Sequence, residues 1–194
     1  MDKATPSNNL PFVLYEIQLK SLKWEFANGS ELDVSRLLSN GRANYILVED
    51  LISTFSGIGA NSQGGKSDLR DIAGFNYEVK SYRDIEAHPS PDLDLFHTAS
   101  SSTFGANNHG PAVKSLLNEG KYPEALQLCK EKGYDKNDFY VYVNSAQYQI
   151  SISLSYVIVP KSDVLRLLSK SDPRLISRRD VLNLVTETVV ISGI

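Results

Sequence analysis

Apolar and polar residues alternate along several stretches of the chain, and this pattern predicts a mixture of strands and helices. The clearest strand covers residues 149–159, where apolar side chains occupy every second position and serines fill most positions between them. Residues 67–82 predict two short strands around a turn at Ala73-Gly74, and residues 139–143 predict a further strand. Residues 145–147 predict a turn.

Helices are predicted where proline, glycine and serine punctuate a helical spacing of apolar residues. Pro111 and Pro123 stand at two predicted helix starts, Gly120 and Gly133 follow the corresponding ends, and a third helix covers residues 162–169 with Ser162 as its cap. The order of these elements predicts a mixed α/β (α+β) layer architecture without internal repeats.

The first third of the chain is less regular. Residues 12–26 are apolar-rich and fit either a strand or a helix, Ser30 is placed to cap a short helix, and residues 45–55 fit a helix. Four glycines make residues 57–65 a predicted loop. We therefore expect a largely helical N-terminal region at 1–55 and a core at 56–194, within one compact domain.

Composition narrows the function classes. The chain has 194 residues and a net charge of −3, which argues against a uniformly basic nucleic-acid coat. A single cysteine excludes an internal disulfide and a multi-cysteine zinc site. There is neither a membrane-spanning apolar run nor a signal-peptide pattern, so we expect a cytoplasmic protein without a membrane partner.

Charge is unevenly distributed along the chain. Residues 61–100 carry seven acidic and four basic side chains, whereas residues 161–194 carry six basic and four acidic ones. The basic C-terminal segment fits either a solvated helix face or a surface that contacts phosphates.

The acidic segment contains the most informative group of residues. Glu78 and Lys80 are two positions apart, so a strand places both side chains on one face and directs Val79 into the core. Asp68 lies ten residues before Glu78, and a hairpin would bring the two carboxylates together. Two adjacent carboxylates repel unless a cation lies between them, and Mg²⁺ prefers such oxygen ligands. A lysine on the same face can then act on an attacking water or a phosphate.

This region has three other interpretations. The hairpin fits an ordinary surface turn with a Glu–Lys pair, and Asp71 is an alternative to Asp68 as the metal ligand. Residues 60–67 match a permissive P-loop pattern, but strand residues follow where a P-loop needs a helix, so no nucleotide cofactor is expected.

Asp68 and the segment 71–81 (Asp-Ile-Ala-Gly-Phe-Asn-Tyr-Glu-Val-Lys-Ser) together resemble the active-site motif of the PD-(D/E)XK nucleases, and most closely that of type II restriction endonucleases. This resemblance implies the restriction-endonuclease-like fold, a central mixed β-sheet flanked by helices. It also implies that Asp68, Glu78 and the main-chain carbonyl of Val79 ligate Mg²⁺. Lys80 would act on the attacking water.

The function implied by this resemblance is Mg²⁺-dependent hydrolysis of double-stranded DNA at a short palindromic site, leaving 5′-phosphates. Such an enzyme would act as a homodimer, because a two-fold dimer matches a two-fold DNA site, and residues 1–55 would form the dimerisation region. A homing or repair nuclease with the same active site, and a non-catalytic DNA-binding domain, remain as alternatives.

The segment that would read DNA bases departs from the family pattern. Residues 96–98 resemble the entry to the family's recognition segment, but residues 99–101 are Ala-Ser-Ser where the relatives carry consecutive histidines. Asparagine in this segment suits bidentate contact with adenine, and a flexible polar loop is the alternative interpretation. The candidates for contacts with base edges are His97, Thr98, Ser100, Ser101, Thr103, Asn107, Asn108 and His109.

Overall fold

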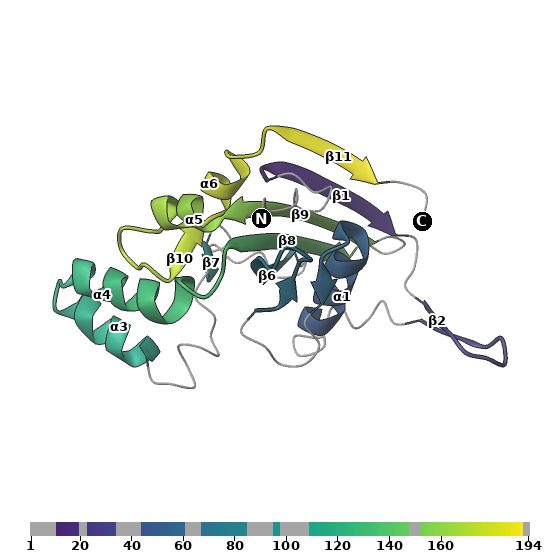
Figure 1. The fold of residues 1–194 in the computed structure, drawn as a ribbon, viewed down its shortest axis with the longest axis horizontal. Helices are drawn as coiled ribbons and strands as arrows, with labels where there is room; N and C mark the ends of the chain where they lie inside the picture. Colours follow the sequence, from purple (N-terminus) through teal and green to yellow (C-terminus); the bar gives the residue numbers. More distant parts are fainter. Residues whose placement is uncertain are drawn as a thin grey trace.

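The centre of the protein is a seven-stranded mixed sheet, seen in a computed structural model that describes residues 11–19, 23–33, 44–60, 67–84, 95–97, 109–147 and 152–191 (Figure 1). Two neighbouring pairs, β1 with β11 and β6 with β8, are parallel, and the other pairs are antiparallel. In spatial order the strands are β11 (Glu187–Ile191), β1 (Val13–Leu19), β9 (Ile152–Pro160), β8 (Phe139–Gln147), β6 (Asn76–Asp84), β5 (Leu69–Arg70) and β4 (Gly59–Ala60).

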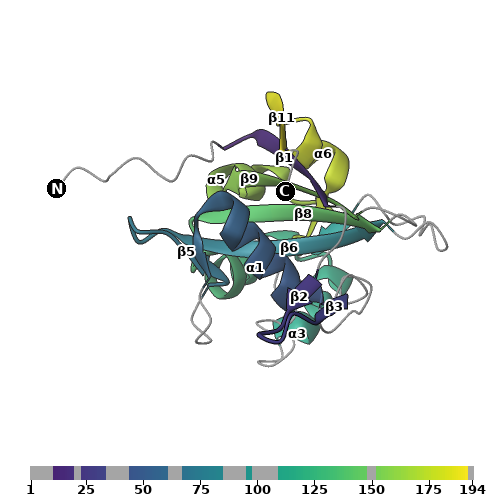
Figure 2. The same ribbon diagram turned by 90° about the vertical axis from the view of Figure 1, so that its right-hand side faces the viewer.

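Helices cover both faces of this sheet, as predicted for a mixed α+β architecture. One face packs against α1 (Asn44–Ser56), which crosses it in the side view of Figure 2. The other face packs against α3 (His109–Asn118), α4 (Tyr122–Cys129), the π-helical turn η2 (Lys130–Tyr134), α5 (Lys161–Leu167) and α6 (Arg178–Leu182). No helix of the described residues is long and apolar enough to cross a bilayer.

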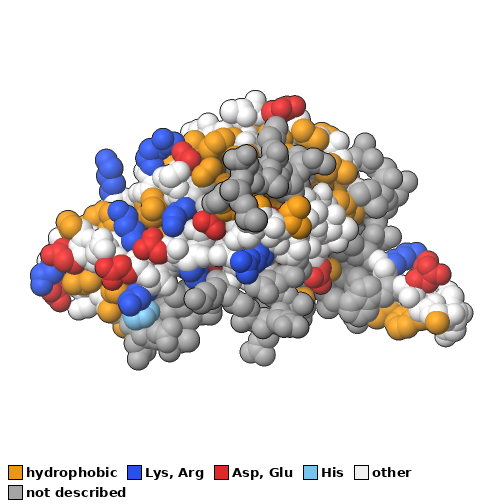
Figure 3. All heavy atoms as spheres, viewed as in Figure 1, with side chains coloured by type: hydrophobic (Ala, Val, Ile, Leu, Met, Phe, Trp, Pro, Cys, Tyr) orange, Lys and Arg blue, Asp and Glu red, His pale blue; other side chains and the backbone are white. Residues whose placement is uncertain are grey.

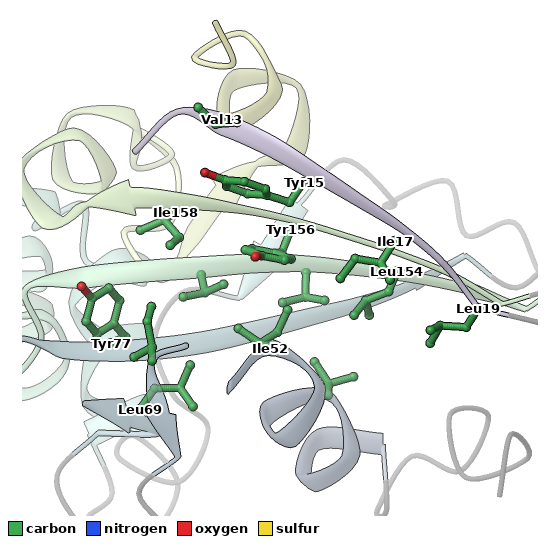
Figure 4. Close-up of a cluster of buried hydrophobic side chains, with 14 residues drawn as sticks. Val13, Tyr15, Ile17, Leu19, Ile52, Leu69, Tyr77, Leu154, Tyr156 and Ile158 are labelled. Carbon is green, nitrogen blue, oxygen red and sulfur yellow. The ribbon is translucent and has the colours of Figure 1, made fainter. Parts of the chain in front are cut away.

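Successive side chains of β9 point to opposite faces of the sheet, and apolar residues at both sets of positions make both faces apolar there. Leu154, Tyr156 and Ile158 belong to the core on the α1 side, whereas Val157 and Val159 belong to the core on the opposite side. Figure 4 shows the α1-side core, in which Ile52 of α1 lies beneath the sheet. A strand buried on both faces contributes apolar surface to two layers at once, so β9 links the two cores.

The predicted largely helical N-terminal region is wrong for residues 11–33. Residues 13–19 form β1, which lies inside the central sheet between β11 and β9. The segment after Ser30, predicted as a short helix, is instead β3 (Glu31–Asp33), which pairs with β2 (Lys23–Glu25) in a separate hairpin. In β1 the burial alternates along the strand, and this period of two is the strand signal that the apolar content of residues 12–26 obscured.

Two smaller predictions are also corrected. Residues 145–147 continue β8 rather than forming a turn. Helix α5 begins directly after Pro160, and Ser162 is not its capping residue, because its hydroxyl instead contacts Asp163.

A further two-stranded sheet pairs β7 (Leu95–His97) with β10 (Leu175–Ser177).

Two isoleucines on α1 provide a matched test of how this helix is held. Ile52 is fully buried against the sheet, whereas Ile46 is 52% exposed. Truncating Ile52 to alanine leaves a cavity, so we expect Ile52→Ala to lower the free energy of unfolding by about 2–4 kcal/mol. Ile46→Ala should change it by roughly 0.5 kcal/mol or less. Urea denaturation followed by circular dichroism measures both, and equal effects would contradict this packing of α1.

Candidate functional site

The hairpin between β5 and β6 positions the acidic residues singled out in the sequence. Its turn contains Gly74 at φ 85°, a backbone conformation that glycine adopts at little cost. Asp71 holds this turn, because its Oδ1 accepts the Phe75 N–H at 2.9 Å and its Oδ2 accepts the Tyr77 hydroxyl at 2.9 Å. Both carboxylate oxygens of Asp71, the alternative metal ligand, are therefore engaged within the hairpin.

Asp68 lies at the open end of the same hairpin, beside β6. Its backbone N–H donates to the Tyr77 carbonyl at 3.1 Å, and its Oδ2 accepts the Val79 N–H at 2.7 Å. Burial raises the pKa of Asp68, and the neighbouring Glu78 carboxylate raises it further. Asp68 and Glu78 are thus near enough to interact electrostatically, in agreement with the predicted turn.

The two faces of strand β6 carry different kinds of residue, apolar core residues on one and charged residues on the other. Tyr77 and Val79 face the α1-side core, where the Tyr77 ring stacks on Phe139 with centroids 5.0 Å apart. The alternation of the strand turns Glu78 and Lys80 to the opposite face. There the Lys80 Nζ lies 2.5 Å from the Glu78 Oε1, which confirms the prediction that these two side chains share a face.

Glu78 is a buried carboxylate with cationic and amide neighbours on both oxygens. It is 4% exposed. Besides Lys80 at its Oε1, its Oε2 accepts a hydrogen bond from the Asn137 Nδ2 at 3.1 Å and lies 3.5 Å from the Lys136 Nζ. A buried charge requires such compensation, because removal from water costs several kcal/mol for each ion.

Glu49 is the acidic residue near this site that the sequence analysis missed. It lies half-buried on α1, and its pKa is raised to about 7 by burial and by repulsion from Asp68, Asp50 and Glu78. A signal was present in the sequence, since Glu49 and Asp50 interrupt the apolar run 45–55. The structure therefore adds a third carboxyl group to the electrostatic environment of Asp68 and Glu78.

The residues proposed to read DNA bases are described only in part. His97 ends β7 and pairs with Leu175 of β10, and His109 begins α3. These two residues lie on elements other than the β5–β6 hairpin. The other candidates, Thr98, Ser100, Ser101, Thr103, Asn107 and Asn108, lie outside the described residues.

Three of the six basic side chains of the C-terminal segment form ion pairs within the protein. Arg166 lies 2.5 Å from Asp163, Arg174 lies 2.6 Å from Asp172, and Lys161 lies 3.8 Å from Asp135. On the face shown in Figure 3, basic and acidic side chains are intermingled over α3, α4 and α5. These ion pairs favour the solvated-surface interpretation of the segment for the residues they include.

Two carboxylates at this site are candidate oxygen ligands for a cation. Within the residues that the structure describes, no group of three or more His, Cys, Asp or Glu side chains is gathered as a metal site. The half-buried Asp68 and the buried Glu78 nevertheless form a pair of repelling carboxylates, and this donor set suits a small oxygen-preferring cation. The backbone of Val79, between Glu78 and Lys80, lies against Asp68.

Comparison of the chain with protein-family models, with curated proteins and with solved structures finds no significant match.

The raised pKa of Glu49 gives a pH-dependent stability that can be measured. Its value of about 7, against 4.5 for an ordinary glutamate, means that the folded state binds this proton more tightly than the unfolded state. Stability is therefore lost as pH rises from about 4.5 to about 7, and the loss is complete above that range. Glu49→Gln removes the ionisable group and with it this loss of stability. At pH 8 we therefore expect the free energy of unfolding of Glu49→Gln to exceed that of the wild type by about 1 kcal/mol, after allowance for solvent screening.

Thermal unfolding between pH 4.5 and 8 tests this expectation. The gain of the Glu49→Gln variant should disappear toward pH 4.5. Glu187→Gln, at an exposed position of β11, is the control and should show no comparable pH-dependent gain. A Glu49→Gln protein that is no more stable than the wild type at pH 8 would contradict the environment assigned to Glu49.

Proposed function

We propose that this protein is a Mg²⁺-dependent endonuclease of double-stranded DNA, of the type II restriction class with a restriction-endonuclease-like fold. The observation that carries the proposal is the meeting of Asp68, Glu78 and Lys80 on the β5–β6 hairpin, near one edge of the mixed sheet. The flanking of that sheet by helices on both faces supports the same proposal.

Asp68 and Glu78 would hold the Mg²⁺, with the main-chain carbonyl of Val79 as a third ligand by resemblance. When bound, Mg²⁺ supplies a positive charge that acidifies water and stabilises charge on a phosphate. Burial supports this assignment, because a buried Glu78 and a half-buried Asp68 that repel each other gain from a shared cation.

Lys80 would place its ammonium beside the reacting phosphate. Its side chain is 14% exposed and shares a strand face with Glu78, so it is held close to the proposed ligands while part of it reaches solvent. In the proposed hydrolysis, a water oxygen forms a bond to phosphorus and the bond from phosphorus to the 3′-oxygen breaks. The water gives up a proton and the 3′-oxygen gains one, so the products are a 5′-phosphate and a 3′-hydroxyl. Lys80 would act on the attacking water and stabilise the charge that develops on the phosphate.

A homodimer is part of the proposal because one such site cuts one strand. Two copies related by a two-fold axis would cut both strands of a palindrome. We place the contact between copies in residues 1–55. Strand β1 is committed to the sheet, whereas the β2–β3 hairpin exposes Phe26 at 49% and Leu32 at 41%, which leaves apolar surface there for a partner.

Asp68→Asn and Lys80→Met test the catalytic assignment. Each should lower Mg²⁺-dependent cleavage of unmethylated phage DNA at least about 100-fold, because each removes a group that holds or stabilises charge at the phosphate. Asp68→Asn should keep or raise the melting temperature, since it removes a half-buried carboxylate that repels Glu78. Lys121→Met, which removes an exposed lysine paired with Glu119, should leave cleavage unchanged.

Other outcomes of this experiment are informative. Loss of cleavage in Asp71→Asn but not in Asp68→Asn would move the metal ligand to Asp71. Wild-type protein that binds DNA without cutting it would favour the non-catalytic DNA-binding alternative. Fragment ends mapped to one short palindrome would identify a restriction enzyme, a long site would identify a homing enzyme, and cuts at junctions or flaps would identify a repair nuclease.

A further inference from the structure

A second lysine outside the Glu-x-Lys motif contacts the central carboxylate of the site. Lys136 lies in the short connection between η2 and β8, far from the hairpin in sequence, and its Nζ lies 3.5 Å from the Glu78 Oε2. The neighbouring Asn137, 1% exposed, donates to the same oxygen at 3.1 Å. Glu78 is therefore approached on one oxygen by Lys80 and on the other by this connection.

The backbone around Lys136 is anchored to the start of β6. Asn76 and Asp138 exchange two hydrogen bonds of 2.9 Å, in which the Asn76 N–H donates to the Asp138 Oδ2 and the Asp138 N–H donates to the Asn76 carbonyl. The Asn76 Nδ2 also donates to the Lys136 carbonyl at 3.3 Å. These contacts tie the connection to the strand that carries Glu78, so the position of Lys136 beside that carboxylate is set by the fold.

The charges at this point determine what Lys136 does. Without a metal, two ammonium groups face the one carboxylate of Glu78, and Lys136 also attracts the Asp68 carboxylate. A divalent cation on Asp68 and Glu78 would repel a lysine at that distance. The Lys136 side chain is 28% exposed, so it has room to turn from Glu78 toward solvent, where the substrate phosphate would lie.

We propose that Lys136 competes with the divalent cation for Glu78 and, once displaced, becomes a second cationic contact to the DNA phosphate, complementary to Lys80. This inference rests on the proposed nuclease function. It assigns opposite effects to one residue, because loss of Lys136 should favour metal binding and disfavour the reaction with DNA. A lysine that merely supported the fold would not produce that combination.

The test uses Lys136→Met, with Lys136→Arg to restore the charge and Lys121→Met as an exposed-lysine control. Mn²⁺ is added to each protein without DNA, and the free ion is measured by electron paramagnetic resonance. We expect Lys136→Met to bind Mn²⁺ about three- to tenfold more tightly than the wild type, because a competing cation is gone. In Mg²⁺-dependent cleavage it should raise KM for DNA about tenfold, and the arginine variant should recover most of that loss.

The outcomes separate this inference from the proposed function. Wild-type protein that neither binds Mn²⁺ nor cuts DNA overturns both. If the wild type binds and cuts while Asp68→Asn abolishes both activities, but Lys136→Met behaves like Lys121→Met, only the role of Lys136 is overturned. Weaker Mn²⁺ binding in Lys136→Met also overturns it, and unchanged melting temperatures show that each comparison is made between folded proteins.

Discussion

The strongest constraint on this structure is the buried carboxylate of Glu78, which lies on the face of β6 opposite α1 and is 4% exposed. Glu78 can remain charged there only if cations and hydrogen-bond donors replace the water it has lost. Lys80 supplies one cation from the same strand, while Lys136 and Asn137 come from the connection before β8. The parallel pairing of β6 with β8 is what brings that connection to Glu78. Topology, local charge and the candidate chemistry therefore depend on one buried group.

Strand β6 can carry this group because its other face is committed to the core. Tyr77 and Val79 pack on the α1 side and hold the strand in register, so one polar face is supported by one apolar face. The register has a consequence for function, since a shift by one residue would turn Glu78 and Lys80 into the α1-side core and move Tyr77 and Val79 to the face that now holds the candidate site. Asp71 strengthens this register, because its carboxylate accepts hydrogen bonds from Phe75 and Tyr77 across the turn. It therefore stabilises the hairpin that carries the site without being one of the proposed ligands.

The hairpin and the strand β9 could be predicted from sequence because their signals are local. A period of two and a turn at Ala73-Gly74 suffice to place Glu78 and Lys80 on one face. The place of β1 in the sheet could not be predicted in this way, because its partners β9 and β11 follow it by more than a hundred residues. The same limit applies to Lys136 and Asn137, which meet Glu78 only through the pairing of β6 with β8. Contacts between distant segments carry no periodicity that a single sequence displays.

The acidic net charge takes on a different meaning once these positions are known. Glu49, Asp68 and Glu78 come from a helix and a hairpin and converge in one electrostatic environment, where burial and then mutual repulsion raise the pKa of Glu49 to about 7 and also raise that of Asp68. Such convergence is costly for the fold, and proteins concentrate perturbed carboxylates of this kind at functional sites. Two lysines offset the cost only in part, since the pKa values stay raised in their presence. The remaining imbalance is what the proposed divalent cation would remove, and in this way the excess of acidic residues supports the proposed cation-dependent reaction.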